Sequence, residues 1–248
     1  MPETKFGLPE EVIYCKTCVI SNQRPITALE TKHKASNLKR TTTIGEDGVC
    51  DACRWSEYKK KQIDWNKKEV ELLKLLDKHR SKSGDYDVVV PASGGKDSCY
   101  VAHILKHKYG MNPLTVTWAP HIYTDIGWKN FSSMIGSGLD NILVTPNSKI
   151  HRKLTSLAFL NLGHPFQPFI VGQRLVGPRI AIEKNIPLVF YGENVAEYGN
   201  PWKDNYSPLM DVNLITAFDI NNKENFLSGT RIQDLYDVYK FEKKDLKI

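Results

Sequence analysis

Ser93-Gly94-Gly95-Lys96-Asp97-Ser98 is the most informative stretch of this sequence, because it directly follows an apolar run, Val88–Val90, and precedes a helix-like segment, Cys99–Lys108. A buried strand, a glycine turn and a helix N-terminus together form an anion-binding device, since unpaired backbone N–H groups and the positive end of the helix dipole converge there. The two glycines let the backbone turn sharply and approach a ligand closely. The sequence therefore predicts a phosphate-binding loop at residues 93–98.

The side chains of this loop favour a nucleotide that carries a metal ion. Ser93 and Ser98 offer hydroxyl donors, and Lys96 adds a positive charge. Asp97 would repel a bare phosphate, but it fits if Mg²⁺ bridges its carboxylate and the phosphate oxygens, because hard cations prefer oxygen ligands. We therefore expect Lys96 and Asp97 to be catalytic, with Asp97 as the magnesium ligand.

Two commoner nucleotide motifs do not match the loop. A Walker A motif requires Ser or Thr after the lysine, whereas Lys96 is followed by Asp97, and the Gly-x-Gly-x-x-Gly fingerprint is missing. Ser-Gly-Gly-x-Asp-Ser after a strand instead resembles the PP-loop of the ATP pyrophosphatase superfamily. That resemblance implies enzymes that cleave ATP to AMP and pyrophosphate while they adenylate a carbonyl oxygen. The alternative is a glycine–serine turn before an ordinary helix.

The length and the net charge of the chain limit the classes of protein to which it can belong. A chain of 248 residues can bury one sizeable core and carry a small appendage. No apolar run is long enough to span a bilayer, and residues 1–11 lack a secretory apolar core, so we expect a cytoplasmic protein without membrane insertion. The net charge is +6, with Lys and Arg concentrated between Lys59 and Lys82. This run is either a solvated helix face or a patch for an anionic partner.

Four cysteines form two Cys-x-x-Cys pairs near the N-terminus: Cys15 with Cys18, and Cys50 with Cys53. Four soft thiolates in a tetrahedral array suit structural Zn²⁺, and Gly48 fits the tight turn that precedes such a pair. The polar segment between the pairs cannot bury a core of its own, so a metal is expected to order it. A redox pair or an iron–sulfur site is the alternative.

The chain divides into four parts by composition. Residues 1–56 form the predicted zinc-binding element, 57–84 a connecting helix, 85–200 an ATP-binding domain, and 201–248 a lid or substrate loop with a terminal helix. The connecting helix is predicted over 56–82, from apolar residues at helical spacing. The terminal helix is predicted over 231–244.

From Asp85 onward, strand and helix patterns alternate, which predicts an α/β fold with a doubly wound parallel sheet. The expected strands are 86–91, 114–118, 141–145 and 187–191. The expected helices are 96–108, 127–135, 149–161 and 171–184, the last with a kink at Pro178.

Ligands of such sheets bind beyond the carboxyl ends of the strands. Trp118 at one strand end is expected either to border the adenine or to close the core, while the backbone of Val116 and Thr117 reads the adenine edge. Three residues follow the last strand. Gly192 is expected to contact the nucleotide, and Glu193 and Asn194 are two further candidates for catalysis. Arg174 and Arg179 lie on the predicted helix before that strand. Each is expected either to contact a phosphate or to lie at the protein surface.

Three features together resemble the N-acetyl sugar amidotransferase family of lipopolysaccharide O-antigen, pseudaminic and legionaminic acid pathways. They are the cysteine pairs with Gly-Val-Cys-x-Ala-Cys, the Pro-Ala-Ser-Gly-Gly-Lys-Asp-Ser loop, and Tyr-Gly-Glu-Asn…Glu-Tyr-Gly at 191–199. The resemblance covers about residues 13–200. Related chains run further, so we expect either a truncated protein or a shorter subfamily.

This resemblance implies conversion of an acetamido group on a nucleotide-linked sugar into an acetamidino group. The amide oxygen would attack the α-phosphate of ATP, and ammonia from a separate glutaminase subunit would then replace AMP. Cys99 is expected to be a core residue rather than a nucleophile for glutamine hydrolysis. The runner-up is a tRNA-thiolating PP-loop enzyme, but beyond Cys53 only Cys99 remains for sulfur chemistry, so nucleic acid is not expected as the substrate.

Overall fold

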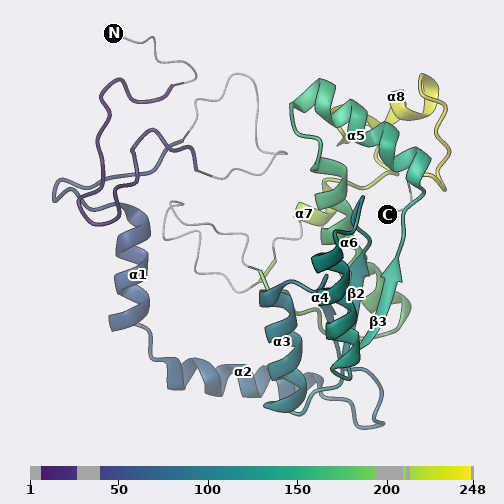
Figure 1. The fold of residues 1–248 in the computed structure, drawn as a ribbon, viewed down its shortest axis with the longest axis horizontal. Helices are drawn as coiled ribbons and strands as arrows, with labels where there is room; N and C mark the ends of the chain where they lie inside the picture. The colour runs from purple at the N-terminus through teal and green to yellow at the C-terminus, as the bar shows by residue number, and fades with distance from the viewer. Residues whose placement is uncertain (1–6, 27–39, 194–208, 211–212, 247–248) are drawn as a thin grey trace. The chain divides into compact units, whose positions relative to one another are not determined.

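The computed structural model of this protein describes residues 7–26, 40–193, 209–210 and 213–246 (Figure 1). The chain forms two compact units. The first, here called the cysteine unit, takes Met1–Val70 and Asn194–Asp211, and the second, the α/β unit, takes Glu71–Glu193 and Val212–Ile248. Within the described ranges, no helix has both the length and the apolar character needed to cross a membrane.

Two helices replace the single connecting helix predicted over 56–82. Helix α1 is Asp51–Lys61 and α2 is Trp65–His79. The carboxylate of Asp64 accepts a hydrogen bond from the backbone N–H of Lys67 at 3.0 Å, so Asp64 caps a new helix. The Trp65 indole donates to the carbonyl oxygen of Lys59 across the break at 3.0 Å. The apolar spacing indicated helix correctly, but the cap at Asp64 was overlooked.

The α/β unit contains a parallel three-stranded sheet in the order β1-β2-β3. The strands are β1 Val88–Pro91, β2 Pro113–Trp118 and β3 Asp140–Val144, each within two residues of its predicted start. The strand predicted over 187–191 is reduced to one parallel bridge, Val89 to Val189, on the free edge of β1. Two backbone hydrogen bonds of 2.8 Å fix this segment beside β1. The Val89 N–H donates to the Leu188 carbonyl oxygen, and the Phe190 N–H donates to the Val89 carbonyl oxygen.

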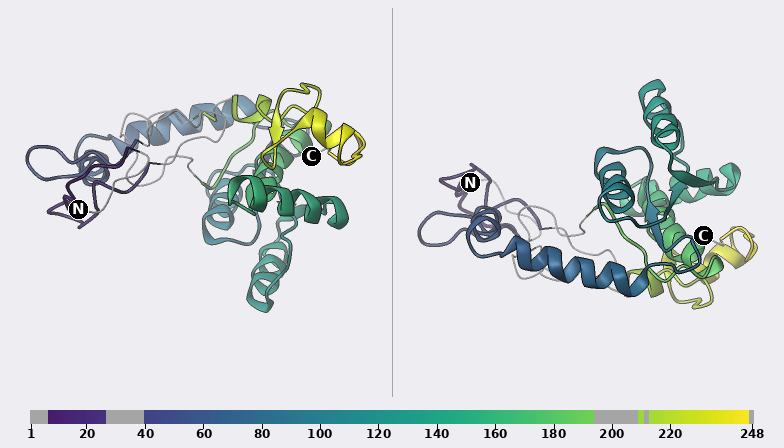
Figure 2. Two further views of the ribbon diagram at one scale, coloured as in Figure 1. Left: turned by 90° about the horizontal axis from the view of Figure 1, so that it is seen from above. Right: turned by 90° about the horizontal axis from the view of Figure 1, so that it is seen from below.

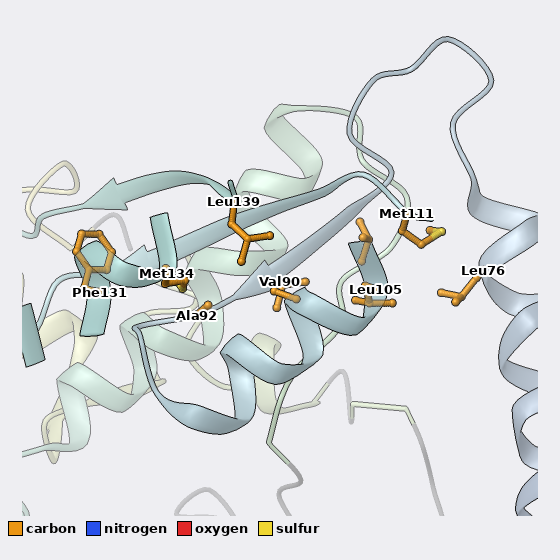
Figure 3. Close-up of a cluster of buried hydrophobic side chains, with 10 residues drawn as sticks. Leu76, Val90, Ala92, Leu105, Met111, Phe131, Met134 and Leu139 are labelled. Atoms are coloured by element: carbon orange, nitrogen blue, oxygen red, sulfur yellow. The ribbon is translucent and has the colours of Figure 1, made fainter. Parts of the chain in front are cut away.

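Each face of the sheet is covered by helices. The first core cluster contains Val88 and Val90 of β1 with residues of α3, Lys96–His107, and α4, Asp125–Gly136 (Figure 3). The second cluster contains Val89 with residues of α6, Gln167–Glu183. Because side chains alternate along a strand, the run Val88–Val90 is buried on both faces. The molecule is thus mixed α/β with a parallel sheet.

Two glycines let α6 pack closely on the sheet. A Cβ at Gly177 would lie 2.6 Å from Pro91 Cγ, and a Cβ at Gly172 would lie 2.2 Å from Trp118 Cε2. Helix α6 begins earlier than predicted, at Gln167, and runs through Pro178.

Gly172→Ala is expected to destabilise the α/β unit by about 1–3 kcal/mol, because the added methyl overpacks the contact with the Trp118 ring. Urea unfolding followed by circular dichroism measures this. Gly136→Ala is the matched control, since an added Cβ there meets nothing within 4 Å. The control should be neutral or stabilising by about 1 kcal/mol at most. Equal unfolding midpoints for the two variants would contradict the packing of Trp118 on α6.

The C-terminal segment packs on α5, Ser148–Leu162 (Figure 1, Figure 2). It contains α7 Asn213–Thr216, the short hairpin of β4 Phe226–Leu227 and β5 Thr230–Arg231, and α8 Ile232–Asp237. The terminal helix predicted over 231–244 is therefore too long. It ends at Asp237, and Lys240 follows with a left-handed φ of 57°, which a helix does not accommodate.

Candidate functional site

The loop at 93–98 has the predicted context of strand, glycine turn and helix. It connects β1 to α3, whose N-cap is Gly95. Gly94 has a φ of +90°, so glycine is required there by the backbone itself. A Cβ at Gly94 would also lie 2.7 Å from the backbone nitrogen of Phe131, so the loop packs directly on the backbone of α4.

Gly95 is required neither by its backbone conformation nor by a steric clash within the protein. Its φ of −72° and ψ of 149° are open to any residue, which corrects the expectation that both glycines make the sharp turn. A Cβ at Gly95 would lie 3.9 Å from Ser93 Oγ and 4.0 Å from Ser98 Oγ. The missing side chain thus leaves room between two serine hydroxyls at the start of a helix, where an anion is stabilised.

The charged residues of the loop are exposed. Lys96 Nζ lies 2.6 Å from Asp97 Oδ1, and the two side chains are 87% and 56% exposed. Such a pair in water stabilises the fold little, so both groups are available to a ligand. Ser98 Oγ donates to the Gly95 carbonyl oxygen at 3.2 Å, which closes the first turn of α3.

Gly192 lies against this loop. A Cβ at Gly192 would be 2.6 Å from Ser98 Cα and 2.9 Å from the Asp97 carbonyl carbon. The segment after the edge bridge therefore meets the first turn of α3 backbone to backbone. Glu193 follows and is exposed, while Asn194 lies outside the described residues.

The candidates at the end of β2 are buried. Val116 and Thr117 have almost no exposed surface, and the Thr117 hydroxyl donates to the Ala92 carbonyl oxygen at 2.5 Å. The Trp118 side chain belongs to the second core cluster and packs on Gly172. Its ring is 5% exposed and so presents no open face for stacking on a base.

Neither arginine of α6 meets a residue of the loop through a described ion pair or hydrogen bond. The backbone carbonyl of Arg174 accepts a hydrogen bond from the Tyr191 hydroxyl at 2.8 Å. The Arg179 guanidinium lies 3.5 Å from Glu183 one turn along the same helix. The Arg179–Glu183 contact lies within α6, and the Tyr191 hydrogen bond joins α6 to the segment that precedes Gly192.

The cysteine unit brings the two Cys-x-x-Cys pairs together. The ligand atoms of Cys15, Cys18, Cys50 and Cys53 all lie within 4.8 Å of one another. Two of the sulfur–sulfur distances are 3.9 Å, for Cys15 to Cys53, and 3.5 Å, for Cys18 to Cys50. Tetrahedral zinc with bonds of about 2.3 Å requires sulfur atoms about 3.8 Å apart, so the four thiols fit a zinc ion.

The backbone around the cysteines supports thiolate formation. The N–H groups of Thr17 and Cys50 donate to Cys15 Sγ at 3.4 and 3.3 Å. Burial opposes ionisation of Cys15, but backbone hydrogen bonds outweigh it and lower the pKa of that thiol to about 6. Gly48 has a φ of +78° and accepts from Lys16 N–H, which confirms the predicted turn before the second pair. Burial raises the pKa of Cys50 and Cys53, and a bound cation would reverse that effect.

One polar cluster was not found from the sequence. His121 follows β2 and His151 lies in α5, and their ring centroids are 4.6 Å apart. A single histidine in each of two distant segments gives no recognisable spacing, so only the tertiary packing of α5, which lies against α6, brings the two together.

No protein-family model and no curated protein sequence matches this chain. A likeness was found to a solved structure, the crystal structure of a predicted subunit of tRNA methyltransferase from Methanocaldococcus jannaschii. The two chains are 21% identical, and the match covers 66% of this chain and 72% of that chain with a TM-score of 0.36. At this TM-score the similarity carries no argument about this chain, whose fold is described by the strand order and the contacts above.

Proposed function

We propose that this protein is an ATP-dependent, AMP-forming amidotransferase that acts on the acetamido group of a nucleotide-linked N-acetyl sugar for surface-polysaccharide or glycan synthesis. One observation carries the ATP-binding part of this proposal. The space left by Gly95 lies between the hydroxyls of Ser93 and Ser98, at the N-terminus of a twelve-residue helix that follows a buried parallel strand. That arrangement suits the phosphates of a nucleotide.

The strand order supports a doubly wound sheet of the PP-loop type. Segment 188–190 pairs with one side of β1, and β2 pairs with the other side. The chain therefore reverses its winding direction next to β1, and such switch points bind ligands at the carboxyl ends of the strands. The loop at 93–98 begins at that end of β1, and Gly192 arrives there from the neighbouring segment.

The proposed reaction begins with attack of the amide carbonyl oxygen on the α-phosphorus of ATP. The bond from that phosphorus to the pyrophosphate oxygen breaks, and the loop receives the developing negative charge through backbone N–H groups, serine hydroxyls and Lys96. Asp97 would hold Mg²⁺, whose charge neutralises phosphate oxygens. Ammonia then attacks the adenylated carbon and AMP leaves, so that nitrogen replaces the amide oxygen. The adenine is not assigned to Trp118, because that ring is packed on Gly172.

Ammonia is proposed to come from a separate glutaminase subunit. The fifth cysteine, Cys99, lies just after the loop in α3 and is half-buried. Burial raises the pKa of its thiol, which disfavours the thiolate that glutamine hydrolysis would need. A cytoplasmic setting is proposed as well, because it keeps the zinc-binding thiols reduced.

A direct assay tests this function. Purified protein is incubated with ATP, Mg²⁺ and an ammonium salt, with nucleotide-linked N-acetyl sugars in one set and bulk tRNA in another, and mass spectrometry follows AMP and the acceptor. AMP formation that depends on the sugar, with oxygen replaced by NH in the product, is expected. AMP formation that depends on tRNA would instead support the thiolating enzyme, and AMP in neither set would count against both.

Gly95→Ala is expected to weaken ATP binding at least tenfold, about 1.4 kcal/mol, while the fold is retained. The added methyl fits the backbone but enters the space between the two serine hydroxyls. Isothermal titration calorimetry with a non-hydrolysable ATP analogue and Mg²⁺ measures the affinity, and Gly136→Ala serves as the control. An unchanged affinity would mean that the phosphates do not lie between the two hydroxyls.

A further inference from the structure

A compact cluster of rings lies at the carboxyl end of β2, on the face of the sheet that α6 covers. Trp118 is the last residue of β2, and its ring centroid is 6.2 Å from that of His151 in α5. His121, three residues after Trp118, lies 4.6 Å from His151 and 5.5 Å from Phe169 of α6. Residues from β2, α5 and α6 therefore meet in one cluster.

The ring nitrogens of His151 and Trp118 are buried without a well-formed hydrogen bond. His151 is 5% exposed, and the Pro168 carbonyl lies close enough to interact with its ring. Neither ring nitrogen makes a hydrogen bond of ordinary geometry with the residues that the structure describes. The same is true of Trp118 Nε1. Buried polar groups in folded proteins are almost always hydrogen-bonded, so unpartnered nitrogens at one place indicate that something else binds there.

The buried His151 ring is neutral at pH 7. Burial lowers the pKa of His151 to about 4, the nearby His121 acts in the same direction, and the Pro168 carbonyl opposes them. A neutral imidazole has one N–H donor and one lone-pair acceptor. Trp118 and Phe169 add an indole and a phenyl ring beside it, so this part of the cluster suits an uncharged polar group with an apolar part.

The cluster lies at the same edge of the sheet as the phosphate-binding loop. Thr117, which precedes Trp118, donates its hydroxyl hydrogen to the carbonyl oxygen of Ala92. Ala92 directly precedes the loop, so this hydrogen bond links the end of β2 to the start of the loop. Trp118 and Thr117 point to opposite faces, as neighbours on a strand do. A ligand that extends over this edge can thus contact both the loop and the cluster.

We propose that His151 and His121 bind the acetamido group of the acceptor sugar, an inference that rests on the proposed function. The amide N–H donates to the free lone pair of His151, and the methyl group packs on the rings of Trp118 and Phe169. Donation by the N–H pushes electron density toward the carbonyl oxygen, which is the atom that attacks ATP. His121 is exposed, so a rotamer change of its side chain uncovers His151.

The size of the site favours acetamido over adenine. His151 and Trp118 are each 95% buried, and the exposed His121 ring lies against His151. An acetamido group has four heavy atoms and a purine has more than twice as many, so the acetamido group requires the smaller displacement of this buried cluster. Adenine binding here is therefore a competing outcome for the experiment.

The first test is NMR of protein with ¹⁵N-labelled histidine, titrated with UDP-N-acetylglucosamine, with UDP-glucose, or with a non-hydrolysable ATP analogue. The His151 and His121 signals are assigned from the variants His151→Asn and His121→Asn. Shifts with the acetamido sugar but not with UDP-glucose support the proposal. Shifts of His151 with the ATP analogue alone, or with no compound, overturn it.

The second test distinguishes a role of His151 in binding the acetamido sugar from a role in maintaining the fold. His151→Phe keeps a ring but removes both nitrogens, and it is expected to raise the KM for the acetamido sugar at least tenfold with the KM for ATP unchanged. His107→Asn, an exposed position at the far end of α3, is the control, and thermal unfolding verifies the fold of both variants. Equal effects on both KM values would indicate a structural role.

The two proposals fail in different ways. If the wild-type protein forms AMP with an acetamido sugar but His151→Phe has an unchanged KM for it, the subsite is wrong and the function stands. If the wild-type protein forms no AMP with any acetamido sugar, the function is wrong, and the NMR titration then decides whether the cluster binds an acetamido group.

Discussion

Asp97→Asn is expected to abolish AMP formation, with a loss on the order of 10³-fold in kcat, while the protein stays folded. The substitution keeps the shape of the side chain but removes the negative charge that would hold Mg²⁺ beside the phosphates. Asp97 is 56% exposed and its described partner is Lys96, so the fold does not depend on it. Mass spectrometry of AMP, at saturating ATP and Mg²⁺, measures the loss.

The control is Asp77→Asn, which removes another exposed carboxylate, one that pairs with Arg80. It should retain full activity and the wild-type unfolding temperature. A raised Mg²⁺ concentration is expected to restore part of the Asp97→Asn activity, because the weaker site fills at higher metal concentration. Unchanged AMP formation in Asp97→Asn would remove this residue from the metal site.

Cys50→Ser is expected to unfold the cysteine unit around the four thiols and to release zinc. Cys50 is fully buried, is the N-cap of α1, and donates its backbone N–H to Cys15 Sγ. A structural zinc ion supplies about 10–16 kcal/mol of apparent binding free energy, far more than the three buried residues of the small cluster there can provide. Zinc content by a chromogenic chelator and limited proteolysis measure the effect.

Cys99→Ser is the matched control, because Cys99 belongs to the α/β unit and packs beside its first core cluster. It should keep one equivalent of zinc. Chelation of the wild-type protein is expected to give the proteolysis pattern of Cys50→Ser while the main thermal transition of the α/β unit remains. A chelated protein as resistant to protease as the zinc-bound one would contradict a structural metal at the four cysteines.

The strands and helices of the α/β unit could be predicted because their signals are local. The run Val88–Val90 is apolar on every residue, as a strand buried on both faces must be, and β2 and β3 were placed to within one residue. The errors occurred where a local signal was overlooked or incomplete. The cap at Asp64 divides the helix predicted over 56–82, and a left-handed residue at Lys240 follows a terminal helix that is shorter than predicted.

The sequence by itself determined the local structure of short stretches of the chain. The loop at 93–98 and each Cys-x-x-Cys pair depend on backbone turns and side chains that are adjacent in the chain, so their residue types and spacing were sufficient. Only the tertiary structure decided which distant residues meet. Three examples are the approach of Gly192 to Ser98, the packing of Trp118 on Gly172, and the pairing of His121 with His151. All three depend on how elements that are distant in the sequence pack together. Such packing is set by the summed burial of many side chains, which no short stretch of sequence contains.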